Sequence, residues 1–255
     1  MATTYLTLTN EVLRELNEVQ LTSANFGSAV GIQAFVKEAT NRALNDIANE
    51  EPQLPFFATA ASGGTDPFYG NVTVATVAGT RWYTLKSGSS SITTDYASID
   101  WDDFYITTIS VSGESAPYVS KGLKFISLTD WRRYLRDQEN ADDADTQNHG
   151  EPQFVVRSPD HRKFGLSPIS DKVYNVHFYA YDAPTELSAH GDTIVFPDQY
   201  ASVIMARTRY YVHQFKENLQ QAAFALDDYK KGMKRMKSNL INPQPKSMTD
   251  DRIYF

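Results

Sequence analysis

A stripe of apolar residues near the C-terminal end is the strongest regularity in the chain. Its members alternate in spacings of three and four, the a/d pattern of a packed helix: Leu219, Ala222, Leu226, Tyr229, Met233, Met236 and Leu240. We call these seven residues the heptad seam. The stripe is extended upstream by Tyr200, Val203 or Ile204, Tyr211 and Phe215. Because Pro197 suits the first turn of a helix, the pattern predicts one long helix over 197–241, about 65 Å in length.

Helical spacing also covers the first fifty residues. Thr9 or Asn10 can cap a short first helix, with Val12, Leu16 and Val19 on one face. A second helix carries an apolar stripe and should end before Pro52; the stripe is Ile32, Val36, Ala39, Ala43 and Ile47. We assign 1–53 to an N-terminal helical part that forms a bundle with the long C-terminal helix.

The middle of the chain, 54–196, has the two-residue alternation of β-strands between turn signals. The clearest run is 172–181, where both faces carry apolar or aromatic side chains. The runs 72–77 and 81–85 flank a turn sequence that is typical of a hairpin. Strands without long intervening helices favour an antiparallel sandwich or barrel-like domain. The predicted fold class is therefore α+β, with the β domain inserted between the helical parts.

Residues 242–255 follow the predicted helix as a separate segment. Asn242, Pro243 and Pro245 stop the helix, and the chain then runs to Ile253, Tyr254 and Phe255. One interpretation is a disordered tail. The other is an extended arm whose terminal aromatic side chains anchor in a groove on a partner.

Composition limits the classes of function. The 255 residues carry a formal charge of −7 and no cysteine, which excludes disulfide scaffolds, cysteine-ligated metals and thiol nucleophiles. A freely diffusing DNA-binding protein normally has a basic excess, so the chain as a whole does not indicate that role. No apolar run is long enough for a membrane span, and no secretory signal is evident. We expect a protein made in a reducing cytoplasm.

Catalytic and metal-binding motifs are incomplete. The stretch 143–147 resembles the start of a calcium loop but lacks the turn glycine and the closing glutamate, so a solvated acidic loop is favoured. Asp100, Asp102 and Asp103 offer a carboxylate pair for glycoside chemistry, although acidic strand entries are common. We therefore expect no catalytic residues, no metal, no cofactor and no enzymatic activity.

A basic cluster lies near the end of the predicted helix: Lys230, Lys231, Lys234, Arg235 and Lys237. These cations complement the dipole at a helix C-terminus and can simply be solvated. They can equally face an acidic partner, either a protein or passing DNA. A protein partner is favoured over DNA because the chain is acidic overall.

Several segments together resemble the head-to-tail adaptor proteins of tailed bacteriophages, also called connector or tail tubular proteins. They are 10–17, 51–55, 166–181, and the junction Phe196-Pro-Asp-Gln-Tyr200 that opens the long helix. The resemblance implies a virion protein of the phage neck that forms a ring, usually of twelve subunits. It also implies binding to the portal and to a tail or nozzle protein, a channel with transient DNA contact, a C-terminal arm reaching the portal, and no membrane partner.

Two other classes stay open. A tail or baseplate β-sandwich module that binds glycan or another tail protein would use the aromatic residues and the carboxylates at 100–103. A hydrolase using scattered carboxylates is the other class. Neither accounts for the heptad seam.

Overall fold

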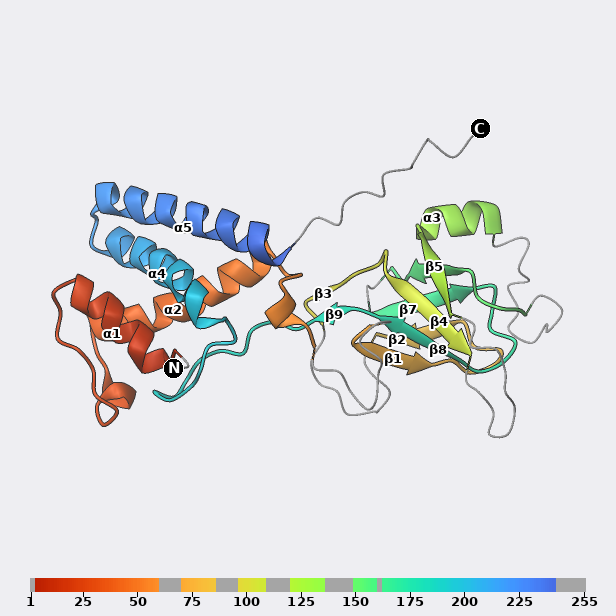
Figure 1. The fold of residues 1–255 in the computed structure, drawn as a ribbon, viewed down its shortest axis with the longest axis horizontal. Coiled ribbons are helices and arrows are strands. Elements are labelled where there is room, and N and C mark those ends of the chain that lie inside the picture. Colours follow the sequence, from red (N-terminus) through yellow and green to blue (C-terminus); the bar gives the residue numbers. More distant parts are fainter. Residues whose placement is uncertain are drawn as a thin grey trace, which may run out of the picture. The chain divides into compact units, whose positions relative to one another are not determined.

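The computed structural model describes residues 3–59, 70–85, 96–108, 120–135, 149–159 and 162–241. The chain divides into two compact units (Figure 1). A helical unit comprises Met1–Phe57 and Ala183–Phe255, and a β unit comprises Ala58–Asp182. The fold is therefore mixed α+β.

The helical unit is built around four long helices: α1 (Tyr5–Glu15), α2 (Ile32–Glu50), α4 (Ala201–Phe215) and α5 (Leu219–Leu240). α4 packs against α2, α1 and α5, and α1 also packs against α2. Short 3-10 turns lie between α1 and α2 at Phe26–Ser28, after α2 at Pro55–Phe57, and directly before α4 at Asp198–Tyr200. The predicted stripe of α2 is confirmed at four of its five positions, since Val36, Ala39, Ala43 and Ile47 are buried and Ile32 is partly buried; the helix ends before Pro52, as expected.

The predicted start of the first helix is wrong. α1 begins at Tyr5, and the hydroxyl of Thr4 accepts a hydrogen bond from the amide of Thr7. Thr9 lies inside the helix and donates its hydroxyl to the carbonyl of Tyr5, while the side chain of Asn10 bonds both backbone groups of Leu21. The helix starts earlier because its first residues are held by another segment: the amide of Tyr5 donates to the carbonyl of Asp192 (2.8 Å).

The single helix predicted over 197–241 is two helices that run back along each other (Figure 1). α4 ends at Phe215, and Glu217 has a left-handed φ of 56°. Asn218 then caps α5 by accepting a hydrogen bond from the amide of Gln221 (3.3 Å). Without a glycine or proline at the turn, the apolar spacing gave no sign of the break.

The β unit contains nine strands in its described part: β1 (Val72–Ala75), β2 (Trp82–Thr84), β3 (Ser98–Ile99), β4 (Phe104–Thr108), β5 (Ser120–Ile126), β6 (Phe154–Arg157), β7 (Lys163–Ser167), β8 (Tyr174–Phe178) and β9 (Ala180–Tyr181). Seven form one curled sheet in the order β1-β8-β4-β5-β6-β7-β2, and β3 pairs with β9. A short helix, α3 (Leu128–Asp130), continues into a π turn at Trp131–Leu135.

Two predictions about strand pairing are wrong. The expected hairpin of 72–77 with 81–85 does not form, since β1 pairs with β8 and β2 pairs with β7. The sheet is also not antiparallel throughout, because β5 and β6 are parallel. All three observed pairings, β1 with β8, β2 with β7 and β5 with β6, join strands that are distant in sequence. Local turn residues do not predict such pairings.

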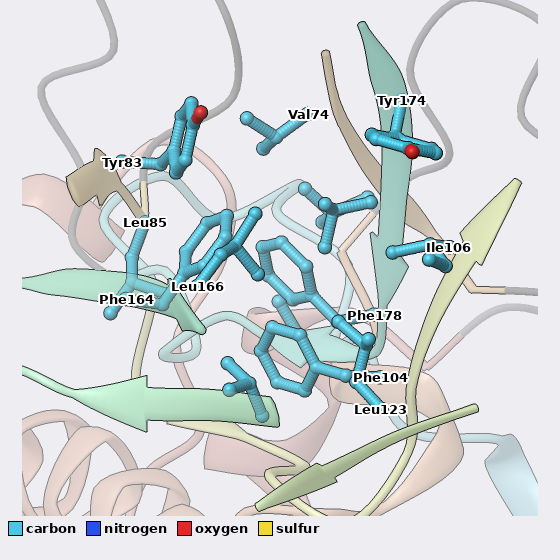
Figure 2. Packing of buried hydrophobic residues seen from close by; sticks show 14 residues of the cluster. Val74, Tyr83, Leu85, Phe104, Ile106, Leu123, Phe164, Leu166, Tyr174 and Phe178 are labelled. Carbon is cyan, nitrogen blue, oxygen red and sulfur yellow. The ribbon is translucent and has the colours of Figure 1, made fainter. Parts of the chain in front are cut away.

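The core of the β unit lies inside the curl of the sheet (Figure 2). The rings of Phe104 and Phe178 stack with centroids 4.9 Å apart, and Phe164 packs against both. On the paired strands β2 and β7, Trp82 covers Gly165, where a Cβ would lie 2.8 Å from the indole. His177 on β8 is buried, and its two ring nitrogens contact the hydroxyls of Thr73 (3.0 Å) and Thr107 (2.8 Å).

Candidate interaction surface of the helical unit

A polar network joins the three helices that carry most of the helical unit. Asp46 on α2 accepts hydrogen bonds from Arg207 Nε (2.7 Å) and from the hydroxyl of Tyr211, both on α4. The guanidinium of Arg207 lies over the rings of Tyr210, Tyr211 and Tyr229, with centroid distances of 4.9 to 5.0 Å. The network therefore links α2, α4 and α5 through a partly buried cation.

The end of α5 is tied to the end of α2. The hydroxyl of Tyr229 donates to Glu50 Oε2 (2.7 Å), and Lys237 Nζ lies 2.8 Å from Glu51 and 3.8 Å from Glu50. Burial, together with the hydrogen bond to Glu50, raises the pKa of Tyr229 far above its ordinary value. Tyr229 thus remains a hydrogen-bond donor across the physiological range of pH.

The heptad seam is buried unevenly. Ala222, Tyr229, Met233 and Met236 are buried in the helical unit, and Leu226 and Leu240 are partly buried. Leu219, at the first position of α5, is 74% exposed. The buried face of α5 therefore begins at Ala222, one turn after the exposed first residue of the heptad seam.

The basic cluster separates into two groups. Lys231 pairs with Asp227 (2.6 Å) and Lys237 pairs with Glu51, so these two cations already have partners. Lys230, Lys234 and Arg235 are exposed and have no ion pair with any other described residue. These three cations are available to a partner.

Large apolar side chains remain exposed where α4 meets α5. Phe215, Leu219 and Phe224 are 59%, 74% and 58% exposed. Phe215 stacks on Phe35 with a centroid distance of 4.3 Å, and the neighbouring α1–α2 connection exposes Val19. The side chain of Gln33 holds the backbone of Val19 (2.8 Å), so these residues gather at one end of the unit. Sequence reasoning missed this surface because Leu219 and Val19 had been placed on buried helix faces.

The segment that leads into α4 forms a groove of about 540 Å³ against α2. Leu44, Leu187, Ile194 and Phe196 contribute apolar walls, and Glu186 and Asp192 are among the polar residues that line it. Asn41 holds this segment by bonding both backbone groups of Leu187 (2.9 and 3.1 Å). The groove is a concave feature of the helical unit, separate in sequence from the exposed apolar residues of α4 and α5.

The comparison with protein families accounts for nearly the whole chain. The family model described as SU10 adaptor protein matches residues 3–250. The chain belongs to the SU10 adaptor protein family. This is a family of structural head-to-tail adaptors of tailed bacteriophages rather than of enzymes. A comparison with curated proteins found no match.

In this SU10 adaptor family member, the carboxylates at 100–103 lie where the chain enters β4. Asp100 accepts a hydrogen bond from the amide of Asp102 (3.1 Å), and the ring of Trp101 stacks on Phe104 (5.5 Å). Burial and then the charge of Asp100 raise the pKa of Asp103, against the hydrogen bond from Tyr105. These residues therefore form the turn that leads into β4, and the stacking of Trp101 on Phe104 holds this turn in place.

Two segments considered in the sequence analysis cannot be compared with the structure. The arm residues Asn242, Pro243, Pro245, Ile253, Tyr254 and Phe255 lie outside the described residues, as does the calcium-like stretch 143–147. Within the described ranges, no group of three or more acidic or histidine side chains is placed to hold a metal ion. No helix in those ranges is long and apolar enough to cross a membrane.

Proposed function

We propose that this protein is a ring-forming adaptor of the phage neck, which joins the portal to the tail and encloses the DNA channel. The observation that carries the proposal is the family match over residues 3–250. In this proposal the ring has twelve copies, the helical unit faces the portal, and the β unit faces a tail or nozzle protein. The chain is a virion component that is assembled in the host cytoplasm.

The surface of the helical unit supports an assembled state. Phe215, Leu219 and Phe224 are each more than half exposed in one copy, and exposed apolar patches are typical of interaction sites. Lys230, Lys234 and Arg235 add unpaired positive charge on α5 among the described residues. We assign these cations to an acidic rim of the portal, with DNA as a transient, non-specific contact.

The arm, residues 242–255, is proposed to reach the portal. α5 ends at Leu240, directly before the arm, and its last turns are fixed by the contact of Lys237 with Glu51. The arm therefore starts from a defined point, and its terminal Ile253, Tyr254 and Phe255 supply the apolar anchors. Repetition of the arm around a ring increases the strength of attachment through effective concentration.

The mass of the purified protein and its appearance in negative stain test the proposal. We expect particles of about twelve times the 28.7 kDa of one chain, with a central hole. They should associate with isolated portal rings. Compact monomers that bind glycan would instead support a tail or baseplate module and would overturn the adaptor proposal.

A further inference from the structure

The chain passes from the helical unit to the β unit through a very short segment that is held on both sides. Phe57, the last residue of the helical unit, is buried and packs on Phe196 with a centroid distance of 5.5 Å. On the β side, the amide of Thr59 donates to the carbonyl of Ala180 (3.0 Å). Between these two fixed residues lies only Ala58, which is exposed. We call residues 57–59 the first crossing.

The chain returns to the helical unit through a longer segment, 182–186, which we call the second crossing. It starts after Tyr181, whose carbonyl accepts a hydrogen bond from the amide of Ala97 (2.8 Å). It ends at Leu187, where the side chain of Asn41 bonds both backbone groups. None of the backbone hydrogen bonds between described residues involves 182–186. The second crossing is therefore fixed at its ends but not along its length.

Asn71 holds the β side of the first crossing. It is 8% exposed, and its Nδ2 donates to the carbonyls of Thr59 (3.1 Å) and Ala180 (2.8 Å), while its Oδ1 accepts from the amide of Ala180 (2.8 Å). Gly70 permits this close approach, because a Cβ at position 70 would lie 2.6 Å from the carbonyl oxygen of Phe178. One buried side chain thus joins the outgoing segment to the returning segment.

We infer that the first crossing is a hinge, in which Ala58 is the pivot and Asn71 fixes the point at which the β unit begins. Hinges are a few residues that absorb the change in backbone angles between two firmly held segments. Ala58 fits this role, since it is small and exposed and its two neighbours are fixed to different units. The second crossing acts as a tether that limits the motion.

The hinge goes beyond the proposed function and does not depend on it. Compact units of one chain move relative to each other unless a large interface joins them. In a neck adaptor, such a hinge lets the β unit follow a tail protein while the helical unit keeps its place at the portal.

The absence of cysteine allows the hinge to be tested with two spin labels on the full chain. Labels on Gln220→Cys in α5 and Thr84→Cys in β2 occupy exposed positions of different units. Pulsed electron spin resonance gives the distribution of distances between them, and dilution with unlabelled chains restricts the signal to pairs within one chain. Gln220→Cys with exposed Ser23→Cys, both in the helical unit, gives the reference width. We expect a severalfold broader distribution for the pair in different units; equal widths would overturn the hinge.

Two matched insertions locate the pivot. Gly-Ser is inserted either between Phe57 and Ala58 or between Thr185 and Glu186, which adds up to about 7 Å of chain in both cases. We expect the first insertion to broaden the distribution by several ångström and the second to broaden it less, because the second crossing is already free along its length. Equal broadening, or the reverse order, would overturn the assignment of the pivot to the first crossing.

A third comparison tests the role of Asn71. Asn71→Ala should broaden the distribution, because it removes the bonds that fix Thr59. Asn10→Ala is the matched control, since Asn10 likewise bonds both backbone groups of Leu21 (2.8 and 2.7 Å) but lies outside both crossings. Equal widths for the two variants would overturn the role of Asn71. If melting curves show that Asn71→Ala does not fold, the two insertions decide the inference.

These outcomes are separate from those that test the proposed function. Rings in negative stain whose chains give the reference width overturn the hinge and leave the adaptor ring intact. A broad distribution in chains that never form rings supports the hinge and overturns the ring.

Discussion

Gly232 on α5 faces Val203 on α4 so closely that a Cβ at position 232 would lie 2.9 Å from Val203 Cγ2. Gly232→Ala should therefore destabilise the protein by about 1 to 3 kcal/mol through overpacking, even though alanine is the better helix former by about 1 kcal/mol. Urea denaturation measures this change in the free energy of unfolding. In a Val203→Ala background, the same change at 232 should be neutral or stabilising. Equal destabilisation in both backgrounds would show that the two residues do not limit the approach of the helices.

The heptad seam supplies its own matched control. Met233 is 2% exposed and Leu219 is 74% exposed. Met233→Asp places an unpaired charge at a buried position of the helical unit and should cost several kcal/mol, roughly 3 or more. Leu219→Asp should change the free energy of unfolding by less than about 0.5 kcal/mol. Thermal melting of the dissociated chains checks both values, and similar losses for the two variants would contradict the burial pattern.

The raised pKa of Asp103 predicts that the stability of the protein depends on pH. Its pKa is raised in the folded state, chiefly by burial, so the ionised carboxylate at neutral pH disfavours the fold. Asp103→Asn should raise the melting temperature slightly at pH 7. The difference should narrow as the pH falls below about 4, where the native aspartate is protonated in both states. Melting curves between pH 3 and 7 measure this difference. A difference in melting temperature between Asp103→Asn and the native protein that widens in acid would show that the pKa of Asp103 is lowered, not raised, by folding.

The carboxylates at 100–103 also bear on activity. Replacing Asp102 and Asp103 together by Asn should leave the yield of infectious particles nearly unchanged, because the arrangement is that of a strand entry. Fully assembled particles that have lost infectivity would reopen a catalytic role for these residues.

Deletion of residues 248–255 tests the proposed arm. The truncated protein should keep its melting temperature, since every residue described as buried in the helical unit lies before Leu240. Attachment to filled heads should be lost, because the apolar anchors are removed. The readout is the amount of protein that sediments with DNA-filled heads. Normal occupancy on heads that retain their DNA would rule out the arm.

Reversing two unpaired charges tests the basic cluster. Lys230→Glu/Lys234→Glu should weaken association with isolated portal rings and reduce its dependence on salt, with no change in folding. Lys231→Glu is the control: it reverses a charge on the same helix, but Lys231 already pairs with exposed Asp227. We expect a smaller loss of binding from the control. Equal losses would indicate general electrostatics rather than a specific contact.

Local patterns in the sequence determined several elements correctly. The stripe of α2 is buried because spacings of three and four residues place side chains on one face of any α-helix. The same geometry explains why Tyr229, Met233 and Met236 face the interior. The run 172–181 forms β8 and β9, because alternation of apolar residues places them on one face of a strand, where a sheet can bury them. These predictions needed no knowledge of distant residues.

The tertiary structure alone decided the remaining features. Thr4 became the first cap because a segment near 190 holds the N-terminus. β1 joined β8 rather than β2, and β5 joined β6 in parallel, since pairing depends on which distant edge is available. The chain turned at Glu217 because burying α5 against Val203, Arg207 and Glu50 outweighs one unfavourable backbone angle. Periodicity records which face of a helix is apolar, but it does not record where that face finds its partner.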